Sequence, residues 1–345
     1  MKKSLLALAV LGAVAGAANA QTNVTVYGLL DAGIARETGG AQGSVWKMAT
    51  GVQSGNRLGF KGTEDLGGGL KANFQLENGF NVDTGTQRQG ALFGRQAFVG
   101  LSGNFGAVNL GRQYDPLFIA LDSVDPFSTG LTGASTNLMA PGSTVFAPND
   151  QTPRVNNAIT YSSPNVSGFS ATVLYGLGET AGDNSANRTY ALSANYANGP
   201  VAAVLAYSST NAPANADKAK VLLVGGTYDF GVAKAHLAYE TEKTDTSGAD
   251  FRDWMVGVSA PVAGGTVLAS YIKKTDKTNS DLGAKQYAIG YTYPLSKRTN
   301  VYTSYGHVTN DANQDLFAGD ASSGGSAPNA GQSSSGFAVG IRHTF

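Results

Sequence analysis

Residues 70–77 alternate strictly between apolar and polar side chains, and this pattern limits the possible folds more than any other feature of the sequence. Leu70, Ala72, Phe74 and Leu76 share one face of a strand, and every residue between them is polar. A soluble sheet must bury its apolar face against a second layer. A barrel in a membrane can instead turn that face to lipid and keep the polar face around water.

The same period of two predicts β-strands along most of the chain. In the first of them, Val24, Val26, Leu30 and Ile34 share one face. The expected strands cover residues 24–36, 45–62, 69–80, 92–102, 106–114, 154–162, 169–177, 188–197, 201–209, 219–229, 233–242, 251–260, 265–275, 284–294, 299–308 and 336–345. After the first twenty residues, no segment approaches the roughly 18 consecutive apolar residues that a membrane helix needs. We therefore expect an all-β chain that forms an antiparallel transmembrane barrel of sixteen strands.

The connectors between the expected strands alternate in length. Residues 102–105, 197–200 and 294–297 are tight turns, while the connectors between them are longer and rich in Gly, Ser, Asn and Asp. Short periplasmic turns on one rim and long outer loops on the other are typical of outer-membrane barrels.

The longest connector, residues 115–153, is too long for an ordinary loop in a compact protein. Inside a wide barrel such a loop can fold into the lumen and narrow it. We expect this loop to form a constriction, with Phe118, Leu121, Phe127 and Leu131 packed against the wall.

Both ends of the chain support an exported barrel. Lys2 and Lys3 precede an apolar run, and Ala18-Asn19-Ala20 matches a cleavage site, so residues 1–20 are predicted to be a signal peptide that is removed. Residues 21–345 would then form the single barrel domain. The last predicted strand runs to Phe345, which we expect to take part in barrel closure and assembly.

The composition argues against several kinds of site. There is no cysteine, and the three histidines lie far apart without a metal-ligand spacing. No nucleophile motif, nucleotide loop or basic patch interleaved with aromatic residues is found. We expect no enzyme activity, cofactor, metal or nucleic-acid partner.

Five segments, spread from the first expected strand to the last, carry a family resemblance. They are NVTVYGLLDAGI, SGNRLGFKGTEDLGGGLKANFQLENGF, LFGRQAFVGLSGNFGAVNLGRQYDP, RVNNAITYSSPNVSGFSATVLYG and GFAVGIRHTF. They resemble the trimeric general diffusion porins of Gram-negative bacteria, in the branch found in β-proteobacteria and neisserial species. The resemblance implies an outer-membrane homotrimer of sixteen-stranded barrels, each with its third outer loop folded inward as an eyelet. Contacts with outer-membrane lipid, lipopolysaccharide and the outer-membrane assembly machinery are expected with it.

Several basic residues are candidates for the wall of that eyelet. If the apolar neighbours on the same strand face lipid, Arg57 and Lys61 point into the lumen, and the parity of its strand also places Arg154 there. Parity leaves Arg95 and Arg112 undecided, because each shares a face with an apolar residue. The resemblance favours Arg95 inside, and it implies a basic cluster at the eyelet that Arg57, Arg95 and Arg154 would supply.

Aspartates of the long loop would form the acidic side of a field across the lumen. The candidates are Asp115, Asp122, Asp125 and also Asp150. Charges discriminate between ions where the lumen is narrow compared with the screening length of about 8 Å at physiological salt. An excess of arginine would favour anions, although the arginines could instead only anchor the loop through salt bridges to these aspartates.

The sequence favours a passive channel for small hydrophilic solutes and ions, with anions preferred. Two alternatives remain open. A barrel enzyme such as a lipase or protease would need a catalytic cluster at the outer rim. A structural or adhesive barrel would have its lumen plugged by the long loop.

Overall fold

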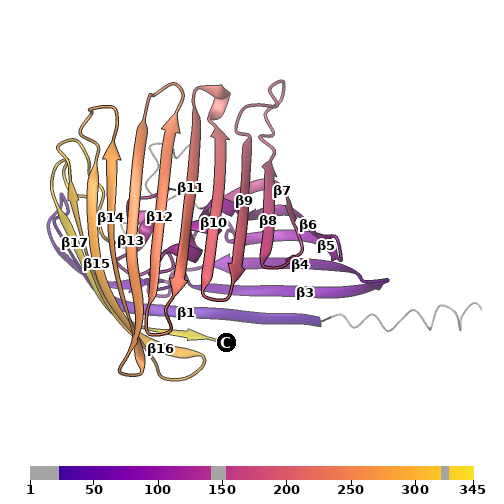
Figure 1. Cartoon of the computed structure of the whole chain (residues 1–345), viewed down its shortest axis with the longest axis horizontal. Coiled ribbons are helices and arrows are strands. Elements are labelled where there is room, and N and C mark those ends of the chain that lie inside the picture. The colour runs from indigo at the N-terminus through magenta and orange to yellow at the C-terminus, as the bar shows by residue number, and fades with distance from the viewer. Residues whose placement is uncertain (1–22, 141–152, 320–325) are drawn as a thin grey trace, which may run out of the picture.

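The computed structural model describes residues 23–140, 153–319 and 326–345, so the predicted signal peptide lies outside the described residues. The strands form one antiparallel sheet (Figure 1). Their bounds are β1 (Asn23–Thr38), β2 (Val45–Thr50), β3 (Arg57–Gly67), β4 (Leu70–Gly79), β5 (Gln96–Gly103), β6 (Gly106–Tyr114), β7 (Arg154–Ser162), β8 (Phe169–Gly176), β9 (Thr189–Asn198), β10 (Val201–Asn211), β11 (Lys218–Asp229), β12 (Lys234–Thr244), β13 (Asp250–Val262), β14 (Gly265–Asp276), β15 (Ala284–Pro294), β16 (Thr299–Asn310) and β17 (Ser334–Thr344).

The sheet closes on itself through β1, which pairs with β17 along one edge and with β2 and β3 along the other. β2 pairs with residues 32–37 of β1 and β3 with residues 23–29, so these two segments share one place in the wall. The barrel therefore has sixteen strands, and the predicted fold is confirmed. In Figure 1 the front wall crosses the back wall steeply, as strand tilt in a barrel requires.

One expected strand is interrupted. The prediction of a continuous strand over residues 45–62 is wrong, because residues 51–56 leave the sheet. The cause is the buried carboxylate of Asp31, whose Oδ2 accepts the backbone N–H groups of Gln53 and Ser54, each at 2.7 Å. Tyr302 donates its hydroxyl to the other oxygen at 2.6 Å. The chain bends inward around this carboxylate.

Inward and outward positions alternate as the sequence predicts. On β1, Val24, Val26 and Ile34 are more than half exposed on the outer face, whereas Asp31 and Ala35 are buried on the inner face. Short connectors gather at one rim and long ones at the other. Among the described residues, no helix is both long and apolar enough to cross a membrane.

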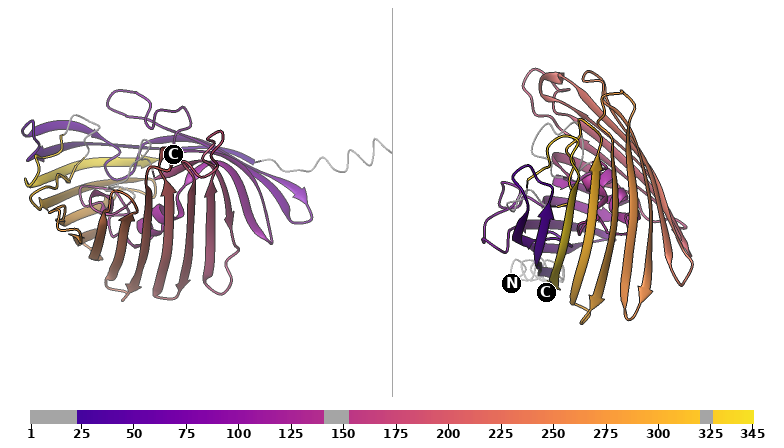
Figure 2. Two further views of the ribbon diagram at one scale, coloured as in Figure 1. Left: turned by 90° about the horizontal axis from the view of Figure 1, so that it is seen from above. Right: turned by 90° about the vertical axis from the view of Figure 1, so that its left-hand side faces the viewer.

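The connector between β6 and β7 is called the inner loop here (residues 115–153), and its described part, residues 115–140, folds into the barrel as predicted. It contains α2 (Pro116–Val124) and η1 (Ser135–Asn137), while η2 (Pro213–Asn215) lies between β10 and β11. Figure 2 shows the short helix α2 inside the curved sheet. The main apolar core lies between this loop and the wall, so the loop, rather than a second layer, covers part of the inner face.

Candidate functional site

α2 begins at a turn that the sequence encodes locally. Asp115 caps the helix, because its Oδ1 accepts the N–H of Leu117 at 2.8 Å, and Pro116 occupies the first helical position. The other oxygen, Oδ2, accepts the hydroxyl of Ser208 on β10 at 2.7 Å. The same carboxylate therefore starts the helix and ties it to the wall.

The apolar side of α2 packs against strands β8 to β12. Leu117, Leu121 and Val124 are almost fully buried, and burial of each such side chain contributes about 1.5–3 kcal/mol. Beyond the helix, Phe127 and Leu131 join a second cluster on the wall. Of the four apolar residues expected there, Phe118 alone is only half-buried, and it stacks on Tyr114 with ring centroids 5.3 Å apart.

A second carboxylate shapes the turn after α2. Asp125 is buried and accepts backbone N–H groups from Phe127, Thr129 and Ser135 at 2.8–3.1 Å. These three bonds fold residues 125–135 back on themselves. The carboxylate of Asp125 is therefore hydrogen-bonded to the backbone of its own loop.

Polar contacts fix the rest of the inner loop to the wall. They are Val124 O to His236 Nδ1 (3.0 Å), Leu131 N to Val52 O (2.6 Å), Thr132 Oγ1 to Ser304 Oγ (3.0 Å), Asn137 Nδ2 to Gln286 Oε1 (2.9 Å) and Leu138 O to Lys274 Nζ (3.1 Å). Their partners extend from β12 round to the 51–56 bend. The loop is thus held along one side of the lumen.

Glycines on the inner face of the wall allow the backbone of the inner loop to lie against the strands. A Cβ added to Gly306 would lie 2.2 Å from Thr132 O, and one added to Gly257 would lie 2.7 Å from the ring of Pro126. Any larger residue at these inward positions would push the loop into the lumen.

The arginine cluster, defined as Arg57, Arg95 and Arg154, lies on the remaining wall. Arg95 Nε is 2.6 Å from Glu77 Oε1, and its guanidinium also donates to the hydroxyl of Tyr114 at 2.6 Å. The guanidinium of Arg154 lies 4.2 Å from the centroid of the Tyr114 ring and donates to the same hydroxyl. Tyr114 therefore joins two members of the cluster.

Among the described residues, neither Arg57 nor Arg154 forms an ion pair, in contrast to Arg95. The Nε of Arg57 donates to Gly55 O at 3.0 Å, within the bend that Asp31 stabilises. The positive charges of Arg95 and Arg342 and the negative charge of Glu77 all lie close enough to act on it. Arg342, on the inner face of β17, was missed by the sequence analysis, although the alternation that selected Arg57 applies equally to the closing strand.

Of the other two basic candidates, Lys61 lies apart from this group, whereas Arg112 is close enough for its charge to act on Arg154. Lys61 is exposed four residues further along β3, with its ammonium 5.1 Å from the centroid of the Tyr27 ring. Arg112 shares the parity of the exposed residue Leu110, and its guanidinium contacts Gly94 O and Asn156 Oδ1.

The candidate aspartates differ in their surroundings. Burial raises the pKa of Asp115, Asp122 and Asp125 above the usual range, against the hydrogen bonds that each carboxylate accepts. Only Asp122 is also close enough to Arg57 for that charge to oppose the shift in its pKa. Asp150 lies outside the described residues. Within the described part of the chain, no ion pair joins the arginine cluster to an inner-loop aspartate.

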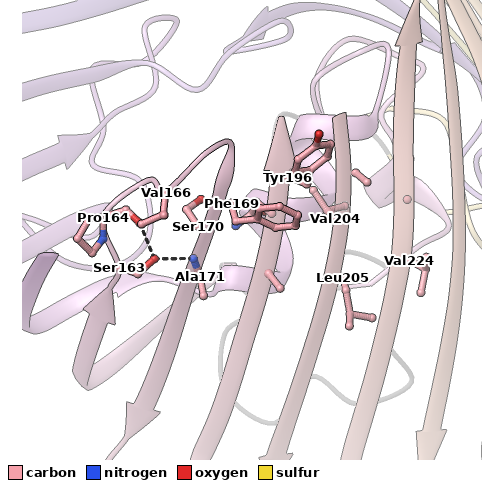
Figure 3. Close-up of a pocket in the computed structure, with 14 residues that line it drawn as sticks. Ser163, Pro164, Val166, Phe169, Ser170, Ala171, Tyr196, Val204, Leu205 and Val224 are labelled. Carbon is pink, nitrogen blue, oxygen red and sulfur yellow. Dashed lines mark hydrogen bonds between the residues drawn. The ribbon is translucent and has the colours of Figure 1, made fainter. Parts of the chain in front are cut away.

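The outer surface carries a separate apolar recess near the rim with the short turns (Figure 3). It encloses about 660 Å³, and exposed residues such as Phe169, Leu205 and Val224 line it. The rings of Phe169 and Tyr196 pack with centroids 4.5 Å apart beside Ala171. Most of its lining lies on the apolar outer face, and Val204, which also lines it, belongs to the core between the inner loop and the wall.

A closed barrel with an apolar outside, a polar inside and a wall-anchored loop beside clustered arginines defines the class of membrane channels. The family model described as Gram-negative porin matches residues 7–313. This chain belongs to the Gram-negative porin family and is an outer-membrane porin.

Individual relatives agree with this assignment. Outer membrane porin protein 32 of Delftia acidovorans is 40% identical, with the whole of both chains covered. The solved structure of an anion-selective porin from Comamonas acidovorans has a TM-score of 0.82 and 35% identity, covering 94% of this chain and all of that one. A trimer form of OmpT of Vibrio cholerae has a TM-score of 0.65 and 15% identity over 94% of this chain and 99% of that one, which shows the shared fold.

Proposed function

We propose that this porin is an anion-preferring channel whose filter is the arginine cluster facing the inner loop. The observation that carries the proposal is an imbalance of charge across the lumen. Two of the three loop aspartates in the described residues are buried in turns, and the arginine cluster meets only Glu77 as a direct ionic partner. Small hydrophilic anions would therefore meet a net positive field at the narrowest part of the channel.

The inner loop narrows this channel rather than plugging it, because its attachments hold it against one wall. Selection would consist of exclusion by size together with the field of the arginines, and no covalent step is involved. We also propose a homotrimer, in keeping with the trimer form known for the OmpT structure. Contacts with lipopolysaccharide and insertion by the outer-membrane assembly machinery belong to the same proposal, with Phe345 part of the closing strand.

Planar-bilayer recording of the purified protein tests the channel. We expect conductance in steps of three and a reversal potential in a salt gradient that shows anion preference. Silence at all voltages would reject the channel.

Neutral substitutions test the filter. A unit charge about 4 Å from an ion in water contributes on the order of 1 kcal/mol, with opposite sign for an anion and a cation. Arg57→Gln should therefore lower the anion-to-cation permeability ratio by up to roughly thirtyfold. Arg154→Gln should act in the same direction. Arg298→Gln, which removes an exposed arginine from a short turn, is the matched control and should leave the ratio unchanged. An unaltered ratio in both cluster variants would show that selectivity arises elsewhere.

A further inference from the structure

Three carboxylates gather on the inner wall behind the end of the inner loop, away from the arginine cluster. Glu240 on β12 lies directly opposite Asp253 on β13, and Asp253 lies opposite Lys274 on β14. Glu242 follows on the same face of β12. All four residues are at most 4% exposed. The register of three neighbouring strands thus places Glu240, Glu242 and Asp253, called the carboxylate cluster here, beside one lysine.

Lys274 does not neutralise this cluster alone. Its ammonium lies 2.7 Å from Glu242 Oε1, 3.1 Å from Asp253 Oδ2 and 3.1 Å from Leu138 O, which engages its three N–H donors. If all three carboxylates are ionised, one ammonium leaves two negative charges in a buried place. A proton shared by Asp253 and Glu242, whose side chains lie within hydrogen-bond range, is one way to reduce that charge. Uncompensated charge of this kind is costly to bury.

Two oxygens of the cluster also lack a hydrogen bond. Glu240 Oε1 accepts the N–H of Ala140 at 2.7 Å, but Glu240 Oε2 has no partner among the described residues. The same holds for Asp253 Oδ1, which belongs to the residue directly opposite. Two buried acceptors without donors, on facing residues, are what a bound cation would satisfy.

The geometry fits a hard divalent cation. One oxygen from each of the three carboxylates lies within 4.8 Å of the others. Calcium binds oxygen at about 2.3–2.6 Å, so oxygens on opposite sides of the ion are separated by roughly twice that distance. A divalent charge would also balance the two negative charges that Lys274 leaves.

We propose that Glu240, Glu242 and Asp253 bind a divalent cation of the calcium class, which fastens the end of the inner loop to the wall. The loop backbone is already tied to this place through Ala140 and Leu138. Such a site contains no histidine or cysteine ligand. Its ligands are carboxylates brought together by strand register.

Terbium luminescence and calcium uptake test this site on the whole purified protein after treatment with a chelator. Trp254 adjoins Asp253, and its ring packs on Tyr239 with centroids 4.4 Å apart, next to Glu240. Tb³⁺ bound by the cluster should therefore emit on excitation of Trp254, and Ca²⁺ should displace it. For an extracellular type of site we expect a dissociation constant on the order of 0.1–1 mM.

Three variants locate the ion. Glu240→Gln combined with Asp253→Asn should abolish the uptake of one Ca²⁺ per chain. Trp254→Phe should lower the terbium emission but leave Ca²⁺ uptake intact, because it removes the sensitiser and no ligand. Asp245→Asn, in the exposed pair with Lys220, is the matched control and should change neither signal.

Calcium uptake by the wild-type protein tests the proposed site even if the double variant does not fold. Uptake of less than one Ca²⁺ per chain at about 10 mM would overturn the proposal, since the cluster would then be neutralised by protons. Equal uptake by folded wild-type and double-variant protein would also overturn it, because the ions would sit on surface carboxylates. Neither measurement depends on conduction, so the result is separate from the test of the channel.

Discussion

At the scale of single residues, the site depends on which charged groups have partners. Arg95 is held by Glu77 and Tyr114, and Arg154 by Tyr114, so these two are fixed in position. Within the described residues, Arg57 donates to a backbone carbonyl and is near the charges of Arg95, Arg342 and Glu77. Arg57 is also the member of the arginine cluster whose charge acts on Asp122, so its removal is the most informative single change.

Acidification should increase the preference for anions through Asp122. Burial raises the pKa of this carboxyl, so it takes up a proton at a higher pH than an ordinary aspartate and loses its negative charge near Arg57. Reversal potentials measured from about pH 7 down to about pH 4 should show the anion-to-cation ratio rising as the pH falls.

Two variants separate this effect from general titration of the surface. Asp122→Asn should give a high ratio at neutral pH and a flatter pH profile. Asp183→Asn is the control, because the hydrogen bond from Ser185 holds the pKa of Asp183 below its usual value, on an outer loop. A wild-type profile in the Asp122 variant would show that another group titrates.

At the scale of elements, the inner loop keeps its position because the wall is shaped to receive it. Gly257 and Gly306 leave room for the loop, Asp115 and Asp125 order its turns, and Gln286 and Ser304 bind its backbone and side chains. Such a loop is predicted from its length, but its path is not, because these contacts join residues far apart in the sequence.

Filling the space at Gly306 should narrow the channel. In Gly306→Val the added side chain would meet Thr132 O and displace the loop toward the arginine cluster. Single-channel conductance should fall, while the barrel remains folded. The matched control is Ala203→Val, which adds the same kind of side chain on the exposed face of β10 and should leave the conductance unchanged. Unchanged conductance in Gly306→Val would mean that the loop moves along the wall without narrowing the lumen.

Loss of the Asp125 carboxylate should loosen the same loop. Asp125→Ala removes the acceptor of three backbone N–H groups, each bond worth about 1 kcal/mol or more to a charged acceptor. We expect faster proteolysis between residues 125 and 139 and noisier open-channel current. Asp125→Asn, which keeps one acceptor oxygen, should show a smaller effect, and equal behaviour of the two variants would argue against this role.

At the scale of the whole molecule, the barrel closes where the two ends of the described chain meet. Gly28 and Phe345 exchange two backbone hydrogen bonds of 3.0 and 3.1 Å, and the Phe345 ring lies over Gly28, where a Cβ would come within 2.2 Å of it. The glycine thus makes room for the last aromatic side chain on the outer face.

Removing that ring should weaken closure without abolishing it. Phe345 is about half exposed, so Phe345→Ala should cost on the order of 1 kcal/mol. The midpoint of heat unfolding, followed by the change in electrophoretic mobility of the folded barrel, should fall by a few degrees. Deletion of Phe345 should lower it further, because the two backbone bonds are lost as well. Identical midpoints for the substitution and the deletion would show that those bonds contribute nothing.

The sequence by itself determined the alternation of strand faces, the two unequal rims, the closing strand and the presence of an inward loop. These features follow from side-chain direction along a single strand and from connector length, which are local properties of the chain. Even here one local prediction failed, since the break at residues 51–56 depends on Asp31 from a neighbouring strand.

Only the tertiary structure decided which charged residues meet. It buried Asp115 and Asp125 in turns, brought Arg342 near Arg57, and placed Glu240 opposite Asp253. The physical reason is that alternation along a strand determines which face of the sheet a side chain lies on, but not which side chains of other strands lie beside it. Those depend on the register between strands around the closed barrel, and on how the inner loop settles against it.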